Sequence, residues 1–123
     1  MIGGIELGGT KCVVAVAHNP LDMIKKEVII TKDPESTLLD IVTFFSNYSI
    51  DFLGVGCFGP IIIDPNSPEY GSLVTDSKEG WKNVNILESL HSICPNIHLD
   101  TDVNAAVIGE YKYGIGKNCD TLV

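Results

Sequence analysis

The hydrophobic positions in the first half of the chain fall into short apolar runs separated by glycine, proline and acidic residues. Runs rich in β-branched residues predict four strands, at residues 3–7, 12–17, 24–31 and 52–57. Between the last two, apolar residues recur at helical spacing after Asp33-Pro34, a pair typical of a helix start. The pattern predicts a helix from Pro34 to about Tyr48.

The second half contains more loop-forming residues. Residues 58–77 carry turn signals throughout, with at most a small extra hairpin, and residues 83–94 have an amphipathic helical pattern that ends before Pro95. A short strand at 97–99, an alanine-rich helix over about 103–113 and the start of a strand at 120–123 follow. Because that last strand has no partner after it, we expect the N-terminal piece of a longer chain.

This order of elements predicts the fold class. Three strands joined by short turns favour antiparallel pairing, and the later strands, separated by helices, favour parallel crossovers. We therefore expect an α/β domain with a mixed sheet. The length of 123 residues fits one domain with a real core.

A glycine turn lies between the first two predicted strands, as Gly8-Gly9-Thr10-Lys11. Adjacent glycines leave backbone N–H groups uncovered, so an anion can approach them closely, and the threonine hydroxyl and lysine ammonium add donors. The turn therefore predicts a site for nucleotide phosphates. An ordinary hairpin turn is the alternative, because Gly-Gly is a common hairpin loop.

Two other phosphate-binding loops do not fit the sequence. The P-loop requires a helix after its lysine, but residues 12–17 form a β run. A G-x-G-x-x-G pattern occurs at 54–59, but the dinucleotide fingerprint needs a helix to begin there, and Pro60-Ile61-Ile62-Ile63 is no helix start. We interpret the second match as coincidence.

Asp102 lies where a predicted strand meets a predicted helix, the place where open α/β sheets tend to bind ligands. The helix dipole stabilises an ionised carboxylate there, and such a group could serve as the general base of a phosphoryl transfer. Capping of the helix is the structural alternative. A metal pair formed by Asp100 and Asp102 is a weaker one, because alternating strand residues face opposite ways.

The composition limits the classes of molecule that the protein is expected to bind. The net charge of −8 argues against nucleic acid and anionic membranes, which are bound largely through cationic side chains. No apolar run is long enough to span a bilayer. The four cysteines have no zinc-ligand spacing, so reduced thiols in a cytoplasmic protein are expected, three of them packed as small apolar residues.

Two separated motifs together resemble the ROK family of sugar kinases and repressors. They are Glu6-x-Gly8-Gly9-Thr10-Lys11 and Thr101-Asp102-Val103-Asn104-Ala105-Ala106-x-x-Gly109-Glu110. The bacterial fructokinase branch is resembled most, through residues 3–6, 56–60, 70–71, 80–81 and 101–104, so that the resemblance covers nearly the whole chain.

The resemblance implies an actin-like, ribonuclease-H-like ATPase fold with two domains facing each other across a cleft, of which residues 1–123 would be the first. It implies an ATP- and Mg²⁺-dependent kinase that phosphorylates fructose, with glucose or mannose as alternative sugars. An isolated first domain is then expected to have little or no kinase activity. The family's E-x-G-H motif and structural zinc site lie in the second domain and have no counterpart here. His91 and His98 are expected to be structural or solvated.

Site residues follow from the same resemblance. Residues 8–11 would bind the ATP phosphates, and Asp102 would be the catalytic base. Glu6 would lie near the metal, although most ROK members have Asp at that position. Gly59, Thr75 and Thr101 would line the sugar site, Thr101 replacing an Asn of many glucose-type members. Trp81 could flank the sugar but is expected in the core.

Two other functions are compatible with the same family resemblance. A ROK-type regulator that senses sugar would carry a DNA-binding helix-turn-helix before the glycine motif, whereas the first predicted strand begins close to Met1. A non-catalytic domain that kept the fold is the other rival, and the retained Asp102 and glycine turn argue against it. The family often forms pairs, so a homodimer is compatible with the sequence.

Overall fold

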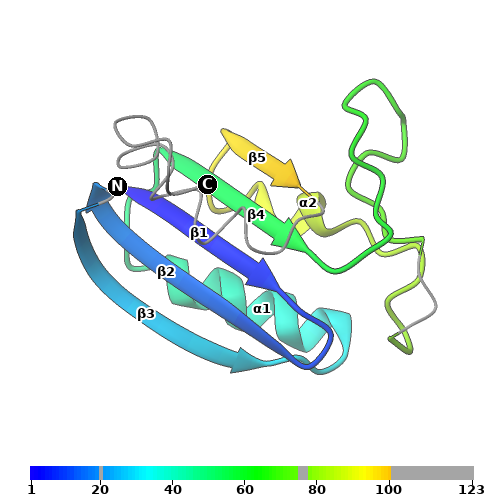
Figure 1. Cartoon of the computed structure of the whole chain (residues 1–123), viewed down its shortest axis with the longest axis horizontal. Coiled ribbons are helices and arrows are strands. Elements are labelled where there is room, and N and C mark those ends of the chain that lie inside the picture. Colours follow the sequence, from blue (N-terminus) through cyan, green and yellow to red (C-terminus); the bar gives the residue numbers. More distant parts are fainter. Residues whose placement is uncertain (20, 75–77, 101–123) are drawn as a thin grey trace, which may run out of the picture.

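The computed structural model describes residues 1–19, 21–74 and 78–100. Five strands form one sheet in the order β3-β2-β1-β4-β5 (Figure 1). They are β1 (Ile2–Leu7), β2 (Lys11–Asn19), β3 (Asp22–Ile30), β4 (Phe52–Cys57) and β5 (Ile97–Asp100). β2 pairs antiparallel with both β1 and β3, whereas β4 pairs parallel with β1 and β5. The predicted mixed sheet, antiparallel first and parallel afterwards, is confirmed.

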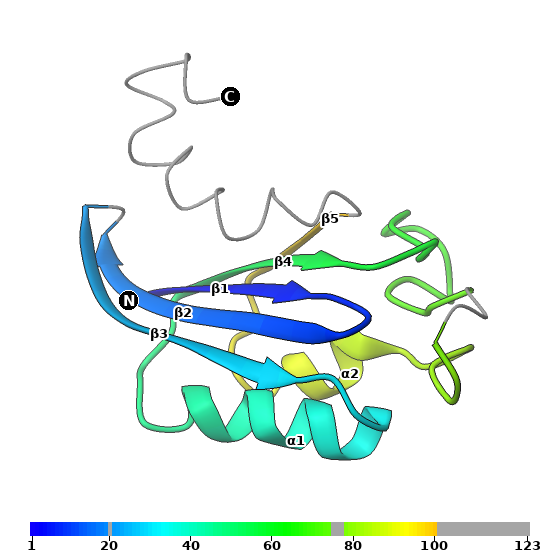
Figure 2. The same ribbon diagram turned by 60° about the horizontal axis from the view of Figure 1, so that its bottom comes forward.

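Two helices, α1 (Pro34–Phe45) and α2 (Ile86–Leu90), lie on the same face of the sheet (Figure 2). The core fills the space between them and the sheet. The core contains fully buried apolar side chains from the sheet and from both helices, among them Ile5, Val14, Ile41, Val55 and Leu90. Strand β3 is the outermost strand on one side of the sheet, and its side chains are mostly exposed.

Helix α1 begins as the sequence predicts. The Asp33 side chain caps it by accepting a hydrogen bond from the Ser36 N–H at 2.9 Å, and Pro34 occupies the first turn. The hydrogen bond from Ser36 lowers the pKa of the Asp33 carboxyl. The helix ends at Phe45, earlier than the predicted Tyr48. The reason is a tighter final turn, in which the Ser46 N–H and hydroxyl both donate to the Thr43 carbonyl.

The second predicted helix, 83–94, is wrong in extent, because α2 covers only Ile86–Leu90. Asn83 has φ of +69°, outside the helical region, and Asn85 caps the helix by accepting from the Leu87 N–H at 3.0 Å. After Leu90 the backbone bonds become i to i+3, as in Ile93 N–H to Leu90 O. Strand β3 likewise starts at Asp22, two residues before the predicted Ile24.

The segment between β4 and α2 contains only isolated bridges among its described residues, Ile61 with Leu73 and Ser72 with Asn85. Trp81 anchors this segment. Its side chain is fully buried, and the indole N–H donates to the Lys32 carbonyl at 2.9 Å. The prediction of Trp81 as a core residue is confirmed.

The predicted helix at 103–113 and the predicted strand at 120–123 lie outside the described residues. Within the part of the chain that is described, no helix has the length and apolar character needed to cross a membrane.

Candidate functional site

Three strand ends meet at one edge of the sheet. β1, β4 and β5 are parallel neighbours, so Leu7, Cys57 and Asp100 end them in the same direction (Figure 1). The chain also changes direction across the sheet here, because β2 and β3 extend to one side of β1 while β4 and β5 lie on the other. Open α/β sheets bind ligands at such a switch point, outside the carboxyl ends of the strands. The glycine turn after β1 lies at this edge.

The two glycines of that turn differ in what the fold requires of them. A Cβ atom on Gly8 would lie 2.7 Å from the Lys11 carbonyl oxygen, which real contacts do not allow. A Cβ on Gly9 would meet no atom within 4 Å, and Gly9 does not have the positive φ that favours glycine. The fold therefore explains the glycine at position 8 but not the one at position 9.

The outer side of the turn carries hydrogen-bond donors. The Gly8 N–H donates back to the Lys11 carbonyl at 3.1 Å, which closes the turn. Among the described residues, the N–H groups of Gly9 and Thr10 have no acceptor, and Lys11 has no ion-pair partner. Gly9, Thr10 and Lys11 are all exposed. Exposed N–H donors beside an ammonium group form a surface suited to an anion.

Thr31, which the sequence did not single out, supports the inner side of the turn. Its side-chain hydroxyl donates to the Gly8 carbonyl at 2.8 Å, and its backbone N–H donates to the Thr10 carbonyl at 3.0 Å. Thr31 is 5% exposed. Only the end of a predicted strand marked this position, because the contact joins residues 23 apart in sequence.

Two buried thiols lie beneath the same edge. The Cys12 sulfur lies 3.3 Å from the Thr31 hydroxyl oxygen, and burial raises the pKa of the Cys12 thiol. Burial also raises the pKa of Cys57 to about 12, with a smaller contribution from Cys12. Both remain protonated near neutral pH. The described cysteines, including Cys94, are buried and free, as expected of thiols packed as apolar residues.

Glu6 faces away from the helices. A Cβ on Gly3 would touch the Phe45 ring of α1, and strand alternation places Glu6 on the opposite face. In the register of the sheet Glu6 pairs with Gly56, and Gly56 pairs with Asp100, so the three occupy one row. Within the described ranges, no three metal-binding side chains form a cluster.

Gly59 belongs to the turn that follows β4. The Phe58 N–H donates to the Leu7 carbonyl at 2.8 Å, which places this turn beside the glycine turn. The Phe58 ring packs edge-on against Trp81, with ring centroids 5.7 Å apart. Gly59 itself is exposed and precedes Pro60 through a cis peptide bond. Thr75, Thr101 and Asp102 lie outside the described residues, although Asp102 follows the end of β5 by only two positions.

His91, which follows α2, and His98, on β5, are both exposed. They are expected to be structural or solvated, and their exposure fits the second of these.

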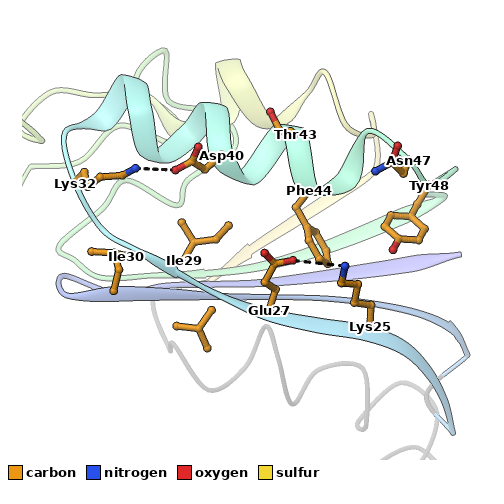
Figure 3. A pocket seen from close by; sticks show the side chains of 11 residues that line it. Lys25, Glu27, Ile29, Ile30, Lys32, Asp40, Thr43, Phe44, Asn47 and Tyr48 are labelled. Atoms are coloured by element: carbon orange, nitrogen blue, oxygen red, sulfur yellow. Dashed lines mark ion pairs between the residues drawn. The ribbon is translucent and has the colours of Figure 1, made fainter.

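A hollow lies between β3 and α1, away from the glycine turn (Figure 3). Its volume is about 510 Å³. Two aromatic side chains line it, Phe44 of α1 and Tyr48, which lies three residues after the end of that helix. Its charged groups pair with one another, Lys32 with Asp40 at 3.0 Å and Lys25 with Glu27 at 3.9 Å. Since its cations are already neutralised, this cleft is less suited to an anion than the glycine turn.

Two curated proteins resemble this chain in sequence. A fructokinase of Lactococcus lactis subsp. cremoris is 38% identical over 89% of this chain and 38% of its own length. A fructokinase of Pediococcus pentosaceus is 38% identical over 96% of this chain and 41% of its own length. The chain thus spans about two fifths of the length of these relatives.

The fold is shared with solved sugar kinases. The structure of a ROK family glucokinase from Streptomyces griseus, in complex with glucose and AMPPNP, matches 92% of this chain and 36% of its own. The TM-score is 0.65 at 18% sequence identity. This likeness confirms the expected actin-like ATPase fold. The model of the ROK family matches residues 2–123, so the chain belongs to the ROK family.

Proposed function

We propose that the full-length protein is an ATP-dependent sugar kinase, a fructokinase, and that residues 1–123 are the N-terminal ATPase-like domain of its two domains. The observation that carries this proposal is the turn after β1. Gly9 has no side chain although the described part of the fold has room for one, and the same turn carries two N–H groups without an acceptor there and the exposed Lys11. An ATP phosphate is the anion that a kinase would bind there.

The turn would act on the phosphates through backbone dipoles and charge. Phosphoryl transfer depends mostly on positioning and on neutralising the charge of the phosphate oxygens. The N–H groups of Gly9 and Thr10, the Thr10 hydroxyl and the Lys11 ammonium supply donors on one side. Gly8 would contribute by allowing the tight turn.

Asp102 is the residue that we assign as general base. It would accept the proton of the sugar hydroxyl as that oxygen attacks the γ-phosphorus. The proposal is supported by the parallel arrangement of β1 and β5, which brings the glycine turn and the end of β5 to the same edge of the sheet. A positioned base contributes roughly 10²- to 10⁴-fold to the rate.

Mg²⁺ prefers oxygen ligands and is commonly held by one or two carboxylates together with substrate phosphates. Glu6 fits that chemistry, because its carboxylate is on the strand that leads into the turn and on the face opposite the helices. When bound, the ion would neutralise phosphate charge. A structural zinc would belong to the second domain.

Gly59, Thr75 and Thr101 are the proposed sugar-contacting residues of this domain, together with Asp102. The position of the Gly59 turn beside the glycine turn supports this assignment for Gly59. Fructose is favoured over glucose and mannose because the relatives quoted above are named fructokinases.

The test is ATP turnover by the full-length protein with a panel of hexoses and Mg²⁺. We expect turnover with fructose, and none from residues 1–123 alone. Asp102→Asn in the full-length protein should lower kcat by at least about 10²-fold. An unchanged kcat would refute the assignment of the base, and no turnover with any hexose would refute the kinase.

A further inference from the structure

We propose that Thr31 is a positioning residue that holds the Gly8–Lys11 turn in the shape that binds phosphate. The proposal rests on the proposed kinase function, since the phosphate is that of ATP. Thr31 does not touch the reacting atoms. It acts through the two carbonyl groups of the turn that it holds.

Peptide planarity makes this contact directional. In a trans peptide the C=O of one residue and the N–H of the next point in opposite directions. The Thr31 hydroxyl draws the Gly8 carbonyl inward at 2.8 Å. The Gly9 N–H, which belongs to the same peptide plane, must therefore point the opposite way, away from the Thr31 hydroxyl.

A second hydrogen bond from Thr31 holds another carbonyl group of the turn. The Thr31 N–H binds the Thr10 carbonyl at 3.0 Å, so both carbonyl oxygens are turned away from the exposed side. A carbonyl oxygen facing a phosphate would repel it, because both carry negative charge. The same residue thus exposes a donor and withdraws two acceptors.

The hydroxyl is itself held in one orientation. Thr31 has a single hydroxyl proton, and that proton goes to the Gly8 carbonyl, so the Cys12 thiol must be the donor in the 3.3 Å contact between its sulfur and the hydroxyl oxygen. The thiol keeps its proton because burial disfavours the thiolate. The result is a chain from the Cys12 thiol through the Thr31 hydroxyl to the Gly8 carbonyl.

The residue after Thr31 fixes the base of this arrangement. The Lys32 N–H donates to the Thr37 hydroxyl of α1 at 2.7 Å, and its carbonyl accepts from the Trp81 indole. Trp81 in turn packs on Phe58, next to the Gly59 turn. The residue next to Thr31 is therefore hydrogen-bonded to two fully buried side chains, which suits a residue that must hold a loop in one shape.

The test compares three variants of the full-length protein. Thr31→Val keeps the shape and removes the hydroxyl, and Thr31→Ser keeps the hydroxyl. Ser46→Ala is the control, because it removes a hydroxyl that also donates to a backbone carbonyl, that of Thr43 near the end of α1 and not one of the turn. The readouts are the Kd for ATP, the KM values for ATP and fructose, and the exchange rate of the Gly8 amide hydrogen. Should Thr31→Val not fold, the smaller Thr31→Ala replaces it in the comparison with Thr31→Ser.

We expect Thr31→Val to raise the Kd and KM for ATP about tenfold and to speed exchange of the Gly8 amide, with the KM for fructose little changed. Thr31→Ser should restore ATP binding to within about threefold, and Ser46→Ala should leave the Kd for ATP unchanged. ATP binding equal to wild type in Thr31→Val overturns the proposal. If the wild-type protein binds no ATP, the kinase proposal fails instead. Gly8 exchange then decides whether Thr31 holds the turn: faster exchange supports it and unchanged exchange overturns it.

Discussion

Gly71 and Gly9 differ in whether the surrounding atoms leave room for a side chain. Gly71, in the segment between β4 and α2, has φ of +90°, and a Cβ there would lie 2.7 Å from the Leu87 side chain. Gly9, in the turn after β1, has no positive φ, and a Cβ there would meet nothing within 4 Å. The interior of the protein excludes a side chain at Gly71. At Gly9 nothing in the described part of the chain does so.

This difference distinguishes a glycine that the fold requires from a glycine that a ligand requires. A glycine that the surrounding atoms require is explained by the stability of the fold. A glycine that they do not require is better explained by a molecule that has to approach the backbone, and the free N–H groups of the turn indicate an anion. Substitutions should therefore change stability at one site and ligand binding at the other.

Gly71→Ala should give the largest loss of stability. The left-handed backbone and the clash with Leu87 together are expected to lower the free energy of unfolding by about 3 kcal/mol. Chemical denaturation of the full-length protein measures it. A loss below about 1 kcal/mol would show that the Leu87 side chain moves away easily, and the contrast with Gly9 would be weakened.

Gly80→Ala isolates the backbone part of that loss. Gly80 has φ of +85°, but the nearest atom to a Cβ would be Pro34 Cδ at 3.7 Å, an ordinary contact. The expected loss is about 1–2 kcal/mol, smaller than at Gly71 because no clash is added. Equal losses at the two positions, measured in the same denaturation experiment, would contradict a role for packing at Gly71.

The buried Cys57 thiol predicts that the stability of the protein depends on pH. Because the pKa of Cys57 is raised to about 12 in the folded protein, the folded state holds this proton more tightly than the unfolded state, whose thiol titrates near 8.5. Its contribution to stability is fully present below pH 8.5 and is lost as the pH rises toward 12. The free energy of unfolding should fall by at most about 1.4 kcal/mol per pH unit in that window.

Cys57→Ala separates this slope from other titrating groups. The variant should be less stable at pH 7, because it leaves a small cavity in the core, yet its stability should decline less steeply between pH 9 and 11. Parallel slopes for the variant and the wild type would indicate that the thiol is not protected in the folded protein.

Much of the fold could be predicted because the signals are local. The hairpin of β1 and β2 follows from apolar runs on both sides of Gly8-Gly9, and the start of α1 follows from Asp33-Pro34. The short α2 could not be predicted, because the apolar pattern continues through residues that tertiary packing and the positive φ of Asn83 keep out of the helix.

The glycine turn of the candidate site could be predicted from the sequence, but the residues that support the turn could not. Its motif is contiguous, so the sequence contains it. The support from Thr31 comes from a residue 23 positions away and depends on the register of β2 and β3. The distinction between Gly8 and Gly9 is also beyond sequence patterns, since it depends on where the Lys11 carbonyl lies.

Gly9→Ala should have the smallest effect on stability and tests the central claim most directly. The full-length variant and wild type would be compared in one titration experiment with ATP, with denaturation alongside. We expect the free energy of unfolding to change by less than about 0.5 kcal/mol, because the methyl group meets open space, and the Kd for ATP to rise at least about tenfold, because that space is where a phosphate approaches. An unchanged Kd for ATP would contradict the assignment of this turn to phosphate binding.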